Sequence, residues 1–173
     1  LPVRVEFTAS LPDEMAGIVA RGFRSIKIKV GALSFQEEVE RIRTLRRTVG
    51  DEVQIMVDAN CAWNDLTYAR KIMRAFEAYN ITWFEEPVYQ NDAALLADLR
   101  RHTSIPIAAG QNEGHRFRHR ELIVNRAVDI AQPNVCSVGG YTEAVKVAAL
   151  ALAFNLPIAN GGGWPHHNMH LQA

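Results

Sequence analysis

Residues 25–58 read SIKIKVGALSFQEEVERIRTLRRTVGDEVQIMVD, and this stretch holds one strand, one helix and a second strand. Apolar and polar residues alternate over 25–30, which is typical of a β-strand. The letters SFQE at 34–37 form a capping box, so a helix is expected to begin there and to continue until Gly50 ends it. A second apolar strand follows at 54–57. The stretch therefore predicts one complete β-α-β unit.

The same unit repeats along the chain. Seven strands are expected, at 3–7, 25–30, 54–57, 81–84, 106–109, 128–132 and 156–159. Six helices are expected, at 11–21, 34–49, 65–79, 92–101, 118–125 and 142–154. Strict alternation predicts a parallel sheet with right-handed crossovers, either an open doubly wound sheet or a closed barrel.

The residues that follow the strands favour the barrel. They are separated by 29, 27, 26, 23 and 27 positions, each about one β-α unit, and they are Lys29, Asp58, Glu85, Gln111, Asn134 and Gly161. In a barrel the carboxyl ends of all strands meet at one mouth, where the catalytic groups of such enzymes lie. We therefore expect a (β/α)8 TIM-type barrel with these residues on one rim.

Composition excludes several classes of function. The 173 residues are enough for one domain, and 19 basic residues balance 19 acidic ones. Zero net charge gives no reason to expect a nucleic acid as partner, and no apolar run approaches the roughly 20 residues of a membrane span. Cys61 and Cys136 fit no metal or redox spacing, so both are expected to be reduced, in a cytoplasmic protein.

Two lysines occupy one face of the strand at 25–30. A period of two places Ile26 and Ile28 on one side of the sheet and Lys27 and Lys29 on the other, which in a barrel is the interior. A lysine confined beside a second cation is a usable base near neutral pH. The alternative is an edge strand with solvated lysines.

Two carboxylates follow the next strands. Asp58 and Glu85 each come directly after an apolar strand. Carboxylate oxygens are the ligands that Mg²⁺ prefers, whereas a single carboxylate at a strand end is more often a helix cap or an ion-pair partner. Two of them at equivalent positions, one unit after a lysine pair, favour a metal site.

These residues resemble the enolase superfamily, and within it the mandelate racemase-like proteins and sugar-acid dehydratases. The resemblance covers about residues 1–173. It rests on Lys27-x-Lys29, on Val-Asp-Ala-Asn around Asp58, on Trp-Phe-Glu-Glu-Pro around Glu85, on Gly110-Gln111-Asn112 and on Gly139-Gly140. It implies that Asp58 and Glu85 bind Mg²⁺, that Lys29 is the base, and that Lys27 activates Lys29 and helps to neutralise the substrate carboxylate.

The sequence departs from this family at the third metal ligand and on the second face of the substrate. Gln111 stands where the family has a third carboxylate, so we expect its amide oxygen to coordinate, with Glu113 as a reserve ligand. Asn134 and Gly161 stand near the places of the Asp-His pair of racemases, and Ser137 where cycloisomerases have lysine. Neither usual second base is present. We expect Asn60, Asn134 and Gly161 to contact substrate instead.

Two hypotheses remain for the second proton transfer. In the first, His166 or His167 bends over the mouth and supplies the acid, since an imidazole titrates near neutrality. Alternatively these histidines belong to the next helix cap or to a surface turn. In the second hypothesis Lys29 acts alone, taking the α-proton and returning a proton to a hydroxyl leaving from the same face. The basic run at 115–120 either grips a polar substrate group or is a solvated helix start.

The function expected is that of a Mg²⁺-dependent lyase that dehydrates a sugar acid, a small carboxylate, through a metal-stabilised enediolate. The alternatives are a racemase or epimerase of the same chemistry, and a degenerate barrel that binds a small acid without turnover. The resemblance implies a homo-oligomer. It also implies that 1–173 is a barrel domain incomplete at both ends, with about seven β-α units and with the last unit and a capping domain elsewhere.

Overall fold

The computed structural model describes residues 11–162 and 165–172. Its centre is a five-stranded parallel sheet in the order β1-β2-β3-β4-β5. The strands are β1 (Ser25–Lys29), β2 (Gln54–Asp58), β3 (Ile81–Glu85), β4 (Ile107–Ala109) and β5 (Ile130–Ala131). Chain neighbours are sheet neighbours throughout, and the order does not reverse as it does at the switch point of a doubly wound sheet. The expected parallel sheet is confirmed.

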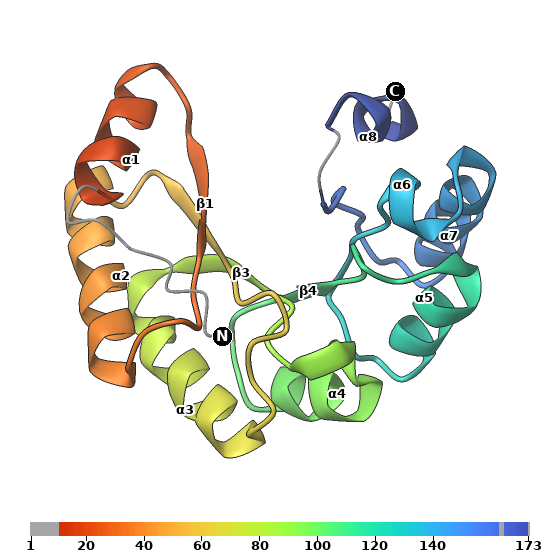
Figure 1. Cartoon of the computed structure of the whole chain (residues 1–173), viewed down its shortest axis with the longest axis horizontal. Helices are drawn as coiled ribbons and strands as arrows, with labels where there is room; N and C mark the ends of the chain where they lie inside the picture. Colours follow the sequence, from red (N-terminus) through yellow and green to blue (C-terminus); the bar gives the residue numbers. More distant parts are fainter. Residues whose placement is uncertain (1–10, 163–164, 173) are drawn as a thin grey trace, which may run out of the picture.

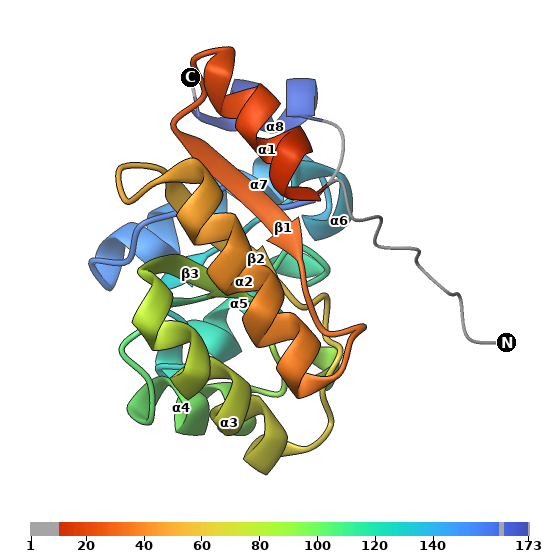
Figure 2. The ribbon, with the colours of Figure 1, turned by 90° about the vertical axis from the view of Figure 1, so that its left-hand side faces the viewer.

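The helices follow one another around the outside of the curved sheet (Figure 1), and Figure 2 shows α2 and α3 in front of it. They are α1 (Leu11–Ala20), α2 (Phe35–Val49), α3 (Leu66–Phe76), α4 (Ala93–Arg101), α5 (His115–Val124), α6 (Val135–Val138), α7 (Tyr141–Ala153) and α8 (Pro165–Gln172), with 3-10 turns at Glu77–Tyr79 and Tyr89–Asn91. None of the helices in these ranges is long and apolar enough to cross a membrane.

Side-chain oxygens fix the starts of the main helices. The capping box predicted for α2 is present, because Ser34 accepts a hydrogen bond from the Glu37 backbone and Glu37 accepts one from the Ser34 backbone. Asp65 caps α3 and Asp92 caps α4 through their carboxylates. Each cap satisfies backbone N–H groups that the first helical turn leaves free. The crossover helices α2, α3 and α4 therefore begin at defined places after β1, β2 and β3.

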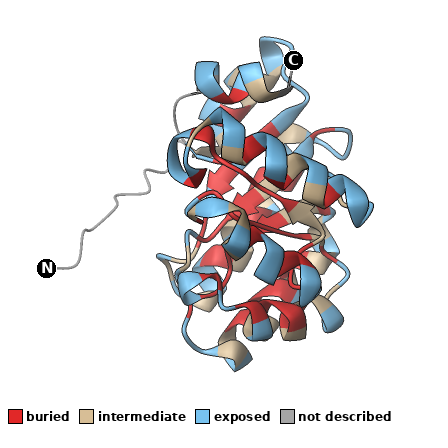
Figure 3. Cartoon of the chain, turned by 90° about the vertical axis from the view of Figure 1, so that its right-hand side faces the viewer, coloured by how far each residue is buried: buried red, intermediate tan, exposed pale blue. Residues whose placement is uncertain are grey.

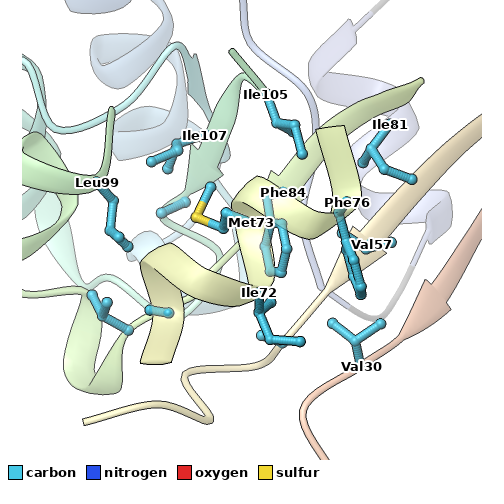
Figure 4. Packing of buried hydrophobic residues seen from close by; sticks show 14 of the residues in the cluster. Val30, Val57, Ile72, Met73, Phe76, Ile81, Phe84, Leu99, Ile105 and Ile107 are labelled. Atoms are coloured by element: carbon cyan, nitrogen blue, oxygen red, sulfur yellow. The ribbon is translucent and has the colours of Figure 1, made fainter. Parts of the chain in front are cut away.

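The main core lies between the sheet and its helices. Ile26 and Ile28 of β1 are buried while the intervening lysines are not, as the alternation predicts. Figure 3 shows the buried residues gathered on the strands and on the inner faces of the helices. In Figure 4, Val57 and Phe84 of the sheet lie beside Ile72 and Phe76 of α3. The helices thus cover one face of the sheet, which leaves the lysine face for function.

One buried arginine joins three segments on the outer side of β2 and β3. The Arg46 guanidinium, from α2, donates hydrogen bonds of 2.7 to 3.0 Å to four backbone carbonyls. These belong to Gly50, Val53, Tyr79 and Asn80. Because a buried carbonyl without a partner is costly, one side chain here satisfies the turns that lead into both strands.

The elements differ from the expected ones mainly toward the C-terminus. The strand expected at 3–7 lies outside the described residues. The one at 156–159 is reduced to a single parallel bridge between Ala131 and Ile158, and the one at 128–132 to two residues. The helix expected at 118–125 begins earlier, at His115. The expected helix 65–79 tightens into a 3-10 turn after Phe76.

Two helices were not among those expected. Helix α6 is only four residues long, too short to show a helical repeat. The Asn134 side chain caps its start by accepting a hydrogen bond from the Cys136 N–H. Helix α8 follows the glycine run at 161–163. Cys61 and Cys136 are both free thiols, in agreement with the expectation from their spacing.

Candidate active site at the strand ends

Two lysines and two carboxylates meet on the face of the sheet that the helices leave open. The Lys29 Nζ lies 2.6 Å from Oδ2 of Asp58. The Lys27 Nζ lies 2.9 and 2.8 Å from the two carboxylate oxygens of Glu85, and 3.5 Å from Asp58. The four residues predicted to share a rim therefore lie together.

Strand register produces this grouping. Lys29 is the register partner of Asp58, and Asp58 is that of Glu85, so the three side chains form one row across β1, β2 and β3. Lys27 lies two residues back on the same face. The side chains of Asp58 and Glu85 are 1% and 0% exposed. Those of Lys27 and Lys29 are 37% and 55% exposed. Buried anions are thus covered by cations that solvent can reach.

Two further side chains hold Glu85, and sequence reasoning missed both. The Gln132 Nε2 donates to Glu85 Oε2 at 2.9 Å, and the Trp83 indole N–H donates to the same oxygen at 3.4 Å. The signals were present, since Trp83 precedes Glu85 by two residues on one strand face and Gln132 ends the strand expected at 128–132. Amide and indole groups are common at strand ends, so their type alone did not mark them.

Gln111 and Glu113 lie in a polar network behind this row. Gln111 donates through Nε2 to Glu86 Oε2 at 2.9 Å. The Glu113 carboxylate accepts from Arg118 Nε at 3.0 Å and from Asn91 at 3.1 Å. Burial raises the pKa of Glu86, and hydrogen bonds from Gln111 and Asn91 oppose this shift. Of the two expected third ligands, Glu113 is thus already paired with a cation.

The three residues expected to bind substrate, Asn60, Asn134 and Gly161, make hydrogen bonds within the protein near the site. Asn60 donates its N–H to Asp58 Oδ1 at 2.9 Å, and its side-chain oxygen accepts from Lys29 at 3.4 Å. Asn134 caps α6 and also accepts from Asn168 of α8. The carbonyl of Gly161 accepts from the same Asn168. Gly161 packs so closely on Gln111 that a Cβ there would overlap the Cβ of Gln111.

His166 and His167 lie in the first turn of α8 and are both exposed. The Nδ1 of His167 lies within hydrogen-bond distance of the Tyr141 hydroxyl of α7, at 3.2 Å. Their place is a helix start, which was the alternative to an acid over the mouth. The role of either as an acid stays a prediction.

The basic run at 115–120 begins α5. Arg116 pairs with Glu143 of α7 at 2.7 and 2.9 Å. Arg118 pairs with Glu113 and with Glu121. Both arginines are thus paired with carboxylates of the same chain, which agrees with the alternative that this run is a helix start.

The donor atoms of this site fit a hard divalent cation. Asp58 and Glu85 supply adjacent buried carboxylates, and Gln132 Oε1 is a buried oxygen without a hydrogen-bond partner within residues 11–162 and 165–172. In the same ranges no three His, Cys, Asp or Glu side chains are grouped closely enough to hold a metal. A third protein ligand from these ranges would therefore be a neutral oxygen such as the amide oxygen of Gln132 or Gln111, which is a weaker but chemically suitable ligand for Mg²⁺.

A buried histidine lies beneath the loop that carries Gln111. His119 of α5 is 1% exposed, and neither ring nitrogen has a hydrogen-bond partner among the described residues. It lies against Gly110, where an added Cβ would come within 2.7 Å of its Cε1. Burial lowers the pKa of His119 to about 4, although Glu113 opposes the shift. The imidazole is therefore neutral in the folded protein near pH 7.

This histidine should make the protein lose stability in mild acid. The unfolded pKa is 6.5 and the folded one about 4, so between these values the unfolded chain binds the proton and the folded chain does not. The stability present above pH 6.5 is expected to fall as the pH drops toward 4, by up to about 3 kcal/mol. Urea unfolding at several pH values checks this. His119→Leu should flatten the slope and exposed His170→Leu should not; equal slopes in both would contradict the assignment.

Comparison with known proteins agrees with this geometry. Residues 10–173 match the family model described as Enolase C-terminal domain-like. Arabinonate dehydratase of Saccharolobus solfataricus is 35% identical over 158 residues, which is 91% of this chain and 41% of that protein. D-Ala-D/L-Ala epimerase of Cytophaga hutchinsonii is 34% identical over 166 residues, 92% of this chain and 45% of that protein. Cycloisomerases are also among the relatives.

A solved structure shows the same arrangement of the chain. L-Talarate dehydratase from Polaromonas sp. JS666, complexed with Mg and L-glucarate, superposes with a TM-score of 0.86 at 33% identity, over 94% of this chain and 47% of that one. The chain spans less than half the length of these relatives. With the family model matched over nearly all of its residues, the chain belongs to the enolase superfamily, among its mandelate racemase-like members.

Proposed function

We propose that the full-length protein is a magnesium-dependent lyase that dehydrates a sugar acid. The observation that carries this is the contact of two lysines with two buried carboxylates, at 2.6 Å for Lys29 and Asp58 and 2.8 Å for Lys27 and Glu85. Dehydratases among the relatives, and the magnesium bound to the similar L-talarate dehydratase, support it. The five-stranded sheet would be part of a (β/α)8 barrel, since its helices cover one face and its strand order is sequential.

In this proposal Asp58, Glu85 and the amide oxygen of Gln111 hold the cation. A bound divalent cation withdraws charge from the substrate carboxylate and makes the neighbouring C–H more acidic. Lys29 first gives up its ammonium proton, and the amine then takes the α-proton while the electron pair of that C–H bond passes into the enediolate. Lys27 stays charged and balances the negative charge that develops on the carboxylate.

Loss of water completes the reaction. The electron pair returns as the bond from the β-carbon to its hydroxyl breaks, and the Lys29 ammonium gives its proton to the leaving hydroxide as water. One base on one face is then sufficient. The resulting enol tautomerises to a 2-keto-3-deoxy acid.

The opposite face favours elimination over inversion. Asn134, whose amide is neither an acid nor a base near neutral pH, is used as the cap of α6. A racemase or epimerase generally needs a proton donor on each face of the substrate. The residues near the β5 end thus support the lyase over the runner-up, while the epimerase relative keeps inversion as an outcome to be tested.

The test is a panel of aldonic and aldaric acids, including arabinonate, gluconate, talarate and galactarate, incubated with full-length protein and Mg²⁺ in D₂O. NMR would follow the α-proton and the product. Formation of a 2-keto-3-deoxy acid supports the proposal, and EDTA should abolish it. Deuterium at the α-carbon with inversion and no loss of water would instead establish a racemase or epimerase. Failure to bind Mg²⁺ would favour a barrel that binds acids without turnover.

A further inference from the structure

Glu86 is a buried carboxylate directly behind the proposed metal ligands. Its backbone φ of 45° lies in the left-handed region, and its side chain contacts Asn91, Gln111 and Asn112, which follow β3 and β4. It is 0% exposed. Such a conformation is uncommon for a residue other than glycine, and here three side chains hold it.

All three partners donate to Glu86. Gln111 donates to Oε2 at 2.9 Å, Asn91 donates to Oε1 at 2.8 Å, and Asn112 reaches both oxygens at 3.2 and 3.0 Å. An ionised carboxylate accepts hydrogen bonds and donates none, which is the pattern seen. The three amide donors therefore stabilise the charged form of the Glu86 carboxylate.

The hydrogen bond to Glu86 determines whether the side-chain oxygen or the side-chain nitrogen of Gln111 is available to bind a cation. An amide at a ligand position can present either oxygen or nitrogen, and only the oxygen coordinates Mg²⁺. Since Nε2 donates to Glu86, Oε1 lies on the other branch of the planar carboxamide. In the described part of the chain Oε1 accepts no hydrogen bond. Donation to an anion also polarises the amide and places more negative charge on Oε1.

We propose that Glu86 is a positioning residue that acts through Gln111 to orient and polarise the third oxygen ligand of the cation. The inference rests on the proposed function. In this arrangement the third carboxylate of the site is Glu86. It does not bind the cation directly but contacts the ligand Gln111 through a hydrogen bond. Groups that hold metal ligands from behind contribute about 10- to 100-fold to metal affinity in other proteins.

Glu38 provides a matched control. It is a carboxylate of α2 that is also 0% exposed. It accepts hydrogen bonds from the Gly31 and Leu33 backbone N–H groups at 2.7 and 3.2 Å and from Arg41 at 3.3 Å, and among the described residues it makes no hydrogen bond with Gln111. Removing its charge tests the general effect of removing a buried carboxylate.

The experiment measures Mg²⁺ affinity by titration calorimetry in the full-length protein. Glu86→Gln is expected to weaken binding by about 10- to 100-fold, and Glu38→Gln by much less. The double variant E86Q/Q111E exchanges the amide and the carboxylate, so the hydrogen bond is reversed and the charge moves onto the ligand. It is compared with the single variant Gln111→Glu and should bind Mg²⁺ at least as tightly, because a carboxylate at 111 no longer needs Glu86. A purely structural role of Glu86 would weaken binding by the same factor in both backgrounds.

Distinct outcomes separate this inference from the proposed function. Wild-type protein that does not bind Mg²⁺ would overturn both. Wild-type binding with unchanged affinity in Glu86→Gln would overturn the inference alone. So would an equal loss of affinity when Glu86→Gln is added to the wild type and to Gln111→Glu. Should Glu86→Gln not fold, Glu86→Asp keeps the charge and draws the carboxylate away from Gln111. Weaker Mg²⁺ binding there supports the inference, and wild-type affinity overturns it.

Discussion

Replacing Lys29 with methionine is expected to lower kcat of the full-length enzyme by about 10³-fold, because the proposed base for the α-proton is lost. Affinity for Mg²⁺ should be kept or should rise. The Lys29 Nζ lies 2.6 Å from Asp58 Oδ2, where it competes with a cation for the carboxylate. Kinetics with the best substrate of the acid panel, together with metal titration of the same sample, measure the two effects.

A matched control is Lys146→Met. Lys146 lies on α7 and pairs with Glu143, away from the strand ends. Its kcat should stay within about twofold of the wild type, as for surface changes distant from a site. If Lys29→Met kept more than about a tenth of the wild-type kcat, a loss too small for general base catalysis, Lys29 would not be the base. If it lost Mg²⁺ as well, the loss of activity would report the metal and not proton transfer.

Replacing Arg46 with methionine is expected to lower the free energy of unfolding by about 3 to 5 kcal/mol, because four backbone carbonyls would lose one shared donor, the bond to Val53 being buried and the other three partly buried. The distances of 2.7 to 3.0 Å place all four within good hydrogen bonds. Chemical denaturation measures the change. Arg47→Met, next along α2 but exposed, should change stability by less than about 0.5 kcal/mol. Equal effects of the two variants would contradict this role of Arg46.

Local patterns predicted the first four described strands to within one residue at either end. Their signals were strong: alternation in β1, a capping box before α2, and aspartate caps before α3 and α4. The prediction weakened where such signals were absent. Helix α5 begins at His115 after Gly114, which offers no side-chain cap, so the start was placed three residues late. Helix α6 has four residues, about one turn, so its apolar residues cannot show a repeated spacing.

The residues of the candidate site also divide into those that local sequence patterns predicted and those that they did not. Lys27, Lys29, Asp58 and Glu85 could be grouped in advance, since a period of two and a repeat of one β-α unit fix both face and rim. Glu86 could not, because its direction depends on a left-handed backbone that sequence alternation does not report. Asn168, which binds both Val135 N–H and Gly161 C=O, acts across segments that meet only in the folded chain.

The alternation of β1 also protects folding against error. Were this strand to pair with β2 one residue out of step, Ile26 and Ile28 would face solvent, and both lysine ammonium groups would enter the hydrocarbon core under α2 and α3. Burying an unpaired charge costs several kcal/mol. Pairing of β1 with β2 one residue out of step is therefore strongly disfavoured during folding. The two groups proposed to handle the substrate thus also select which face of β1 enters the core before any substrate is present.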